Sequence, residues 1–294
     1  MAVRIGANPI GWSNDDLREL GAHIPLETCL AEARAAGFVG MELGHKFPRE
    51  ADALRQALAG HGLELVSGWY SSALMTRDTE AELAALEPHL ALLEALGAKV
   101  LIFAETIGAV HGDRKRPISS RPRLSADDWP RLGRRMTAVA EVVAARGLDL
   151  VYHHHMGTVV ESAEDIHALM AATGAAVKLL LDTGHATFAG ADPAALARRH
   201  RQRIGHVHCK DVRLPMMQRA RQEDWSFLDA VVAGVFTVPG DGGIDFPAVL
   251  AELPDYAGWL VVEAEQDPEK APPARYARIG YDNLSGYARA AGLL

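Results

Sequence analysis

The chain is poor in cysteine and has no long apolar run. Only Cys29 and Cys209 occur among its 294 residues, and their number and spacing match neither a disulfide framework nor a zinc finger. No basic stretch followed by a long apolar segment opens the sequence, and no apolar run approaches the length of a membrane span. These absences exclude a disulfide-rich secreted fold, and we expect a cytoplasmic protein with no membrane partner.

Positive charge is also scarce. The 30 Lys and Arg residues are outnumbered by 38 Asp and Glu residues, which gives a formal net charge of −8. A general nucleic-acid binder neutralises phosphates with basic side chains, so this balance argues against a nucleic-acid partner. Two short basic clusters, at residues 114–123 and 198–203, are expected to be solvated loop or helix faces.

The first apolar run is not followed by the Gly-x-Gly-x-x-Gly motif of a dinucleotide-binding fold. Short β-rich runs instead alternate with longer segments of helical periodicity. The expected strands are residues 3–7, 39–43, 63–68, 99–103, 148–153, 177–182, 205–209 and 259–263. The expected helices are residues 26–36, 50–61, 80–96, 127–146, 163–172, 193–200, 246–253 and 273–291. This alternation predicts a single (β/α)8 TIM barrel that spans residues 1–294.

Two connections, residues 104–125 and 211–244, are longer than a barrel requires. Loops that follow barrel strands lie at the catalytic face, and long loops in compact domains are usually functional. We expect these two to form a substrate lid. The segment 240–243, Gly-Asp-Gly-Gly, precedes a predicted helix and is expected to be a tight turn rather than a phosphate-binding loop.

Polar side chains stand where the predicted strands end. Successive side chains of a strand point to opposite faces, so His153 and His155 share one face. His154 points the other way and is expected to pack between strand and helix. In a barrel enzyme these strand ends carry the catalytic groups. They supply Glu42 and Lys46, His153 and His155, Asp182 and His185, His206, His208 and Lys210, and Glu263 and Glu265.

Four successive strand ends thus offer His153, Asp182, His208 and Glu263 as metal ligands. His208 is preferred to His206 because it lies nearer the end of its strand, and Glu263 is preferred to Glu265 because it lies within the apolar run. Imidazole nitrogen combined with carboxylate oxygen suits Mn²⁺, Co²⁺, Fe²⁺ or Zn²⁺ better than Mg²⁺ or Ca²⁺.

The roles of other residues are left open by the sequence. Trp12 and Trp69 are either an apolar wall for a ring-shaped substrate or plain core residues, and Glu105 faces either the pocket or solvent. His206 either supports the site or is a core histidine. The histidines without an evident partner are expected at the surface or at caps, and these are His23, His61, His89, His111 and His167.

At these residues the chain resembles the xylose-isomerase-like TIM-barrel superfamily. The resemblance covers essentially the whole chain and rests on motifs at residues 7–16, 42–48, 152–158, 181–185, 208–211 and 262–268. Members usually place Glu, Asp, His and Glu at the last four strand ends, so His153 would replace the first Glu. The His-His-His segment and the opening motif Asn-Pro-Ile-Gly-Trp-Ser-Asn-Asp-Asp are most similar to the inosose dehydratase family.

The resemblance implies elimination of water from scyllo-inosose (2-keto-myo-inositol), a cyclic polyol ketone, to a trihydroxycyclohexane-1,2-dione in myo-inositol catabolism. It also implies Mn²⁺ or Co²⁺ as cofactor and leaves a glutathione requirement open. We expect Glu263 to serve as both ligand and acid–base group, with proton transfer by His155, His185 and Lys46. Substrate contacts are expected from Glu42, Trp12, Trp69, His206, Lys210 and Glu265.

Three other functions are compatible with the sequence. A metal-dependent sugar isomerase or epimerase would use the same scaffold and metal but needs no leaving group. A DNA-repair endonuclease of this fold would need further metal ligands and a basic groove, which the net charge disfavours. A sugar-binding barrel without catalysis would not need four occupied strand ends. The oligomeric state, including a homo-oligomer, is left open.

Overall fold

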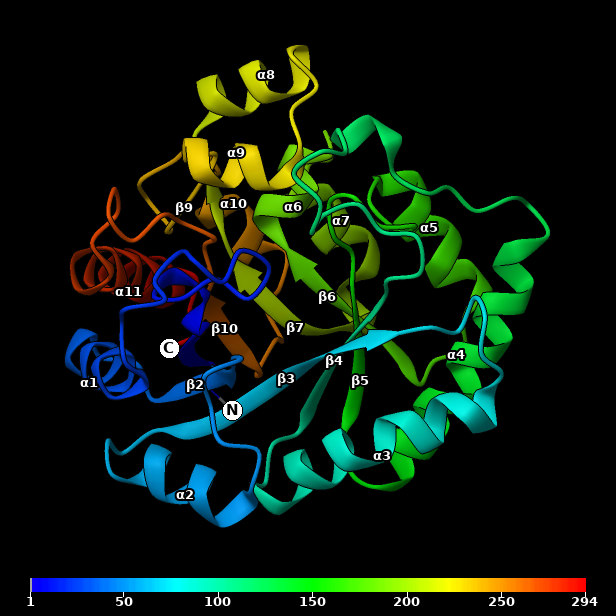
Figure 1. Cartoon of the computed structure of the whole chain (residues 1–294), viewed down its shortest axis with the longest axis horizontal. Coiled ribbons are helices and arrows are strands. Elements are labelled where there is room, and N and C mark those ends of the chain that lie inside the picture. The colour runs from blue at the N-terminus through cyan, green and yellow to red at the C-terminus, as the bar shows by residue number, and fades with distance from the viewer. Residues whose placement is uncertain (1) are drawn as a thin grey trace.

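Eight parallel strands form a closed barrel in the computed structural model, which describes residues 2–294 (Figure 1). Neighbouring strands follow the chain order around the barrel, and the last strand closes on the first with Arg4 opposite Trp259 and Ala7 opposite Val262. The predicted (β/α)8 barrel is therefore confirmed. Its strands are β1 (Arg4–Ala7), β2 (Gly40–Leu43), β3 (Glu64–Ser72), β4 (Val100–Glu105), β5 (Asp149–His153), β6 (Val177–Asp182), β7 (Ile204–Cys209) and β10 (Trp259–Val262).

Helices surround the barrel, and all of the expected ones are present within a few residues of their predicted bounds (Figure 1). None of the helices in residues 2–294 has both the length and the apolar character needed to cross a membrane. The outer helices are α1 (Leu26–Ala36), α2 (Ala51–Ala59), α3 (Thr79–Ala95), α4 (Asp128–Ala145), α5 (Ala163–Ala172), α7 (Pro193–His200), α10 (Phe246–Ala251) and α11 (Pro273–Ala290).

The strands are buried on both faces, which explains their nearly continuous apolar sequence. Outward-facing side chains pack against the helices in one large core. Inside the barrel a small apolar cluster is formed by Val100, Ile102, Val151 and Leu180, with Trp69 packed against it. Because side chains alternate along a strand, the polar residues two positions further on share this inward face. The apolar cluster thus forms a floor beneath the polar strand ends.

The two long connections pack against each other at the C-terminal end of the strands. Within residues 211–244 lie the short strands β8 (Asp211–Val212) and β9 (Phe236–Thr237) and the helices α8 (Leu214–Gln222) and α9 (Phe227–Ala233) (Figure 1). The amide of Ile118 in the other connection donates to the carbonyl of Trp225 at 3.1 Å, and Arg114 forms an ion pair with Asp229 at 2.6 Å. The two connections, residues 104–125 and 211–244, therefore form one joined layer, called the lid layer below, rather than two separate loops.

The expected turn at residues 240–243 is present, and its backbone amides bind the side chain of Asp211. The carboxylate of Asp211 accepts hydrogen bonds from the amides of Val212, Gly240, Gly242 and Ile244 at 2.8–3.0 Å. A Cβ at Gly242 would lie 2.4 Å from Asp211 Oδ1, so glycine is required there. Asp211 is consequently a structural residue that fastens the layer to the end of β7.

Two helical glycines allow a matched test of this packing. A Cβ at Gly133 in α4 would lie 2.2 Å from the carbonyl oxygen of Ala172 in α5, whereas a Cβ at Gly286 in α11 would meet nothing within 4 Å. We expect Gly133→Ala to lower the free energy of unfolding by about 1–3 kcal/mol through overpacking. Gly286→Ala should raise it by up to about 1 kcal/mol because alanine favours a helix. Urea unfolding measures both, and equal stability of the two variants would contradict the packing described here.

Candidate metal centre and active site

A cavity of about 90 Å³ opens at the C-terminal ends of the strands. Seven of the residues predicted from the sequence line it: Glu42, Trp69, His153, His155, His208, Glu263 and Glu265. Four more, Asp182, His185, His206 and Lys210, are buried and contact these lining residues instead of the cavity itself. The strand ends of the barrel therefore converge as the sequence predicted.

The four predicted metal ligands approach one another through one atom each. Asp182 Oδ2 lies 3.6 Å from His153 Nε2 and 3.5 Å from His208 Nδ1, and His208 Nδ1 lies 3.6 Å from Glu263 Oε2. His153, Asp182 and His208 also meet the geometry expected of a metal-holding group. β5, β6 and β7 bring these three side chains together, and Glu263 directly follows β10.

The protein leaves two of these atoms without a hydrogen bond. Within residues 2–294, Asp182 Oδ2 and His208 Nδ1 are buried without a hydrogen-bond partner, while Glu263 Oε2 has the ammonium group of Lys210 at 2.7 Å. Buried polar atoms without partners cost free energy unless a ligand satisfies them. The Nδ1 of His153 donates to the carbonyl of His154 at 2.7 Å, which leaves its Nε2 lone pair facing Asp182. These four residues thus fit a divalent cation held by two nitrogens and two oxygens.

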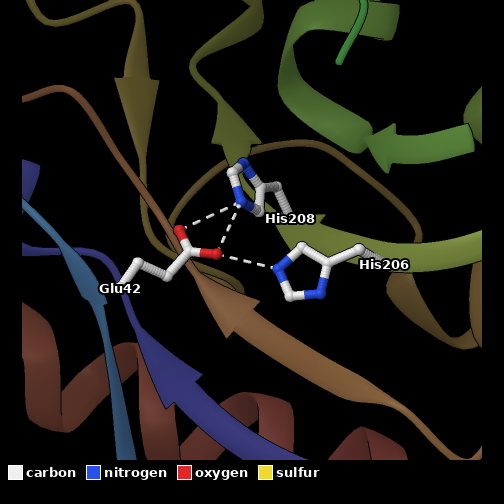
Figure 2. A group of neighbouring side chains, drawn as sticks. All are labelled: Glu42, His206 and His208. Atoms are coloured by element: carbon white, nitrogen blue, oxygen red, sulfur yellow. Dashed lines mark hydrogen bonds and ion pairs between the residues drawn. The ribbon is translucent and has the colours of Figure 1, made fainter. Parts of the chain in front are cut away.

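Glu42 orients His208 from the opposite side of the ring (Figure 2). Its carboxylate lies 3.1 Å from His208 Nε2 and 2.8 Å from His206 Nε2, and it also accepts from Ser67 Oγ and Asn8 Nδ2. Burial alone would lower the pKa of His208, but Glu42, Asp182 and Glu263 raise it to about 10. Because Glu42 accepts at Nε2, the proton of a neutral His208 ring lies on that nitrogen, and Nδ1 is left to face the proposed ligand group.

Lys210 is a fully buried ammonium group among three carboxylates. Its Nζ lies 2.7 Å from Glu263 Oε2 and 3.5 Å from Asp182 Oδ2, and it contacts Glu265 more closely still. Burial would lower the pKa of Lys210, yet the three carboxylates raise it above its usual range. Burial and the charge of Glu265 raise the pKa of Glu263. Lys210 therefore supplies the charge that keeps these acids together.

A second imidazole–carboxylate group lies beside the first. Glu265 Oε1 is 3.7 Å from His155 Nε2 and 3.5 Å from His185 Nε2, while His185 Nε2 is also 2.9 Å from Lys210 Nζ. His185 occupies the first turn of α6 (Thr183–Phe188), where the Asp182 side chain caps the helix by accepting from the His185 amide. Lys210 contacts both Glu265 and His185, so its ammonium group already supplies a positive charge beside this second group.

The lid layer covers this second group with aromatic rings. The ring of Phe227 at the start of α9 lies 5.0 Å from the ring of His155 and 5.7 Å from that of His185. The ring of Phe236 lies 5.3 Å from His185, and Lys210 Nζ lies 4.7 Å from its centre. Residues 211–244, which were expected to form part of a substrate lid, thus contact the site through Phe227 and Phe236.

Two predicted site residues lie elsewhere. Lys46 Nζ donates to the carbonyls of Gly21, Ala22 and Ile24 at 2.6–3.0 Å, so its three protons hold a loop and none reaches the cavity. Trp12 is buried and donates from Nε1 to Glu32 at 2.7 Å, outside the cavity lining. The predicted roles of Lys46 in proton transfer and of Trp12 in substrate binding are therefore corrected.

Three further residues of the sequence analysis lie outside the cavity lining, one as predicted and two not. His154 faces away from the cavity as predicted, and its Nε2 accepts from the Asp182 amide at 3.3 Å. Glu105 faces neither pocket nor solvent, because it is buried and accepts from Ser72 Oγ and the Ile107 amide. His206 is completely buried beneath Glu42 and does not line the cavity, so its predicted substrate contact is corrected to a support of Glu42.

Three ionisable lining residues were missed by sequence reasoning. His111, expected at the surface or at a cap, lines the cavity with its ring 4.9 Å from that of His155. Asp15 and Asp16 also line the cavity. The two aspartates lie in the opening motif that carried the resemblance, which was the available signal. Nothing in the local sequence distinguishes His111 from a surface histidine.

Comparison with known proteins agrees with this architecture. The family of xylose isomerase-like TIM barrels matches residues 30–285. The chain belongs to this family. Among curated relatives, the "Rhizopine catabolism protein MocC" of Rhizobium meliloti is 52% identical over 294 residues, which cover 99% of this chain and 90% of that protein. An "Inosose dehydratase" of Geobacillus thermodenitrificans is 43% identical over 279 residues, or 94% of each chain.

Solved structures show the same xylose isomerase-like fold. An L-ribulose 3-epimerase superposes with a TM-score of 0.69 at 19% identity, and the match covers 99% of this chain and 96% of that one. At this identity the likeness concerns the fold alone. The dehydratase relatives, in contrast, are 40–43% identical in sequence over nearly their whole length.

Lys210 and Lys46 provide a matched pair for testing the charge network. Lys210→Met would leave three buried carboxylates without their ammonium group, and breaking a buried ion pair costs roughly 3–5 kcal/mol. Lys46→Met removes hydrogen bonds to carbonyls only, at about 1 kcal/mol each. Urea unfolding of chelator-treated protein gives the stability, and Mn²⁺ affinity should be unchanged in Lys46→Met. Weakened Mn²⁺ binding in that variant would contradict its place outside the site.

Glu42 offers a test of the proposed ligand group from outside it. Glu42→Gln weakens the acceptor of the His208 proton, and loss of such supporting contacts typically costs 10–100-fold in metal affinity. We expect a loss of that order in Mn²⁺ affinity by isothermal titration calorimetry. Glu105→Gln is the control, because Glu105 is a buried glutamate that makes no contact with a histidine of the site. Equal affinity of the two variants would count against His208 as a ligand.

Proposed function

We propose that the protein is a metal-dependent dehydratase that eliminates water from scyllo-inosose to give a trihydroxycyclohexane-1,2-dione, a step of myo-inositol catabolism. The observation that carries this proposal is the convergence of His153, Asp182, His208 and Glu263 beside one cavity. Relatives named inosose dehydratase, 40–43% identical over nearly the whole chain, support the choice of substrate.

The donor set supports Mn²⁺ or Co²⁺ as the cofactor. Two imidazole nitrogens and two carboxylate oxygens suit these ions, while Mg²⁺ and Ca²⁺ prefer oxygen alone. A divalent cation at this position supplies Lewis acidity, which stabilises the negative charge that develops on a ketone oxygen. The proposed ligands are His153, Asp182, His208 and Glu263.

The elimination needs a base for the proton beside the ketone and an acid for the departing hydroxyl. Glu263 is proposed as the base, because it lines the cavity and Lys210 Nζ, 2.7 Å away, stabilises its charged form. His155 and Glu265 line the same cavity and offer hydrogen bonds to the ring hydroxyls. His185 and Lys210 act through Glu265, since both contact its carboxylate and neither lines the cavity.

A flat apolar surface completes the proposed substrate site. Trp69 lines the cavity with its ring 5.2 Å from that of His153 and 5.8 Å from that of His155. An indole in this position fits the carbon face of a cyclic polyol, while the histidines and carboxylates address its hydroxyl groups. The expected small-molecule substrate, rather than a polymer, agrees with a cavity of this size.

A role in rhizopine catabolism is the second candidate, because the relative at 52% identity carries that name. A sugar isomerase or epimerase is supported only by fold-level likeness. A DNA-repair endonuclease is disfavoured by the net charge of −8. The glutathione requirement, the cytoplasmic location and the oligomeric state stay predictions.

Product analysis separates these candidates. Purified protein incubated with scyllo-inosose and Mn²⁺ should develop the absorbance of an enolic dione, and mass spectrometry should show loss of one water. Glu263→Gln should lower turnover by at least about 10²-fold while the thermal unfolding midpoint is kept. Glu269→Gln, an exposed glutamate after β10, is the control and should match the parent. An isomer of unchanged mass as the product, or full activity of Glu263→Gln, would refute the proposal.

A further inference from the structure

Asp16 is the one carboxyl group of the cavity lining that has no close partner in residues 2–294. Glu42 contacts two histidines, Glu263 and Glu265 contact Lys210, and Asp15 contacts His45. The Asp16 side chain, about 30% exposed, forms no hydrogen bond in the described part of the chain. Its nearest basic group is His111 Nε2 at 3.9 Å. Its oxygens are therefore free to contact a molecule in the cavity.

The surroundings of Asp16 favour its protonated form. Burial and the charges of Glu265 and Asp15 raise its pKa, against an opposing effect of His155 and Lys210. His111 supplies no compensating charge, because burial lowers the pKa of this imidazole to about 3. A carboxyl group that faces a cavity among other acids, beside a neutral imidazole, can hold and release a proton.

The backbone holds Asp16 in a defined position. The side chain of Asn14 accepts from the amides of Asp16 and Leu17 at 2.8 and 2.7 Å, which closes a tight turn. Leu17 is buried in a cluster with Met156 and Phe227, residues of the triple-histidine segment and of α9. The turn is thereby fastened to the same elements that carry His155 and cover it. Asp16 thus belongs to the site although it follows β1, far from the metal ligands in sequence.

We propose that Asp16 is the general acid that protonates the departing hydroxyl group. This inference rests on the proposed dehydratase function. Glu263 takes the proton from the carbon beside the ketone, the electron pair of that bond forms the new carbon–carbon double bond, and the carbon–oxygen bond breaks. The Asp16 carboxyl gives its proton to the leaving oxygen, which departs as water. Partial exposure of Asp16 allows its carboxylate to be reprotonated from solvent.

The alternative is that one group performs both proton transfers, with Glu263 returning its proton to the leaving oxygen. The two schemes differ when Asp16 is changed. If Asp16 is the acid, its loss blocks departure of the hydroxyl but leaves abstraction of the carbon-bound proton intact. That proton then exchanges with solvent deuterium in unreacted substrate. If Glu263 does both, the loss of Asp16 changes neither process.

The experiment follows both processes in D₂O with scyllo-inosose and Mn²⁺. In Asp16→Asn we expect elimination to fall by about 10²–10⁴-fold, while deuterium enters recovered substrate at a rate within tenfold of the parent. Glu263→Gln should lose both. Glu19→Gln, which removes an exposed carboxylate from the same loop, should behave as the parent. Thermal unfolding and Mn²⁺ affinity of Asp16→Asn should equal those of the parent.

Chemical rescue gives a second readout that a purely structural role would not produce. Asp16→Ala opens space beside the cavity, and added acetate at mildly acidic pH should restore part of its elimination rate but not that of Glu263→Gln. Elimination by Asp16→Asn within tenfold of the parent, or equal loss of exchange and elimination, would overturn the inference. A parent protein that shows neither process would overturn the proposed function itself, and with it this role.

Discussion

The buried ammonium group of Lys210 is the interaction on which the site depends. Three buried carboxylates from the ends of β6 and β10 lie within 3.5 Å of its Nζ. Without this charge, the mutual repulsion of Asp182, Glu263 and Glu265 would oppose the closure of the barrel at this end. The lysine lies under the ring of Phe236, so the lid layer also depends on its position.

The two proposed imidazole ligands are oriented by different means. His153 donates its outer proton to a backbone carbonyl, whereas His208 donates to Glu42, which is itself held by Asn8, Ser67 and His206. Each arrangement selects one tautomer and leaves one nitrogen facing the group of acids. Glu42 thus lines the cavity and also orients His208. His206 supports Glu42 through a hydrogen bond, from a position outside the cavity lining.

Most of the candidate site could be predicted from the sequence by counting alternate positions at the ends of the expected strands. Parallel strands of a barrel bring their ends to one rim, so period-two counting predicted that His153, His155, His208 and Glu263 share one face, and all four line the cavity. The same counting could not place Trp12 and Lys46. Both lie past their strand ends, where the path of the loop decides which way a side chain points. Trp12 donates to Glu32 of α1, and Lys46 donates to backbone carbonyls of a neighbouring loop. Asp16 and His111 were missed for the same reason, since each reaches the cavity from a loop beyond the end of a strand.

The sequence by itself determined the barrel, because alternating apolar runs and helices have one economical closure when every strand is buried on both faces. It also determined the chemistry available at the rim, because side-chain alternation is a local property of a strand. Only the tertiary structure decided which of those groups face the cavity, which stand behind it and which carboxyl group is left without a partner. Those outcomes depend on contacts between segments distant in the chain, such as Lys210 with Glu265 and Leu17 with the cluster that contains Phe227 of α9, and no local pattern encodes such contacts.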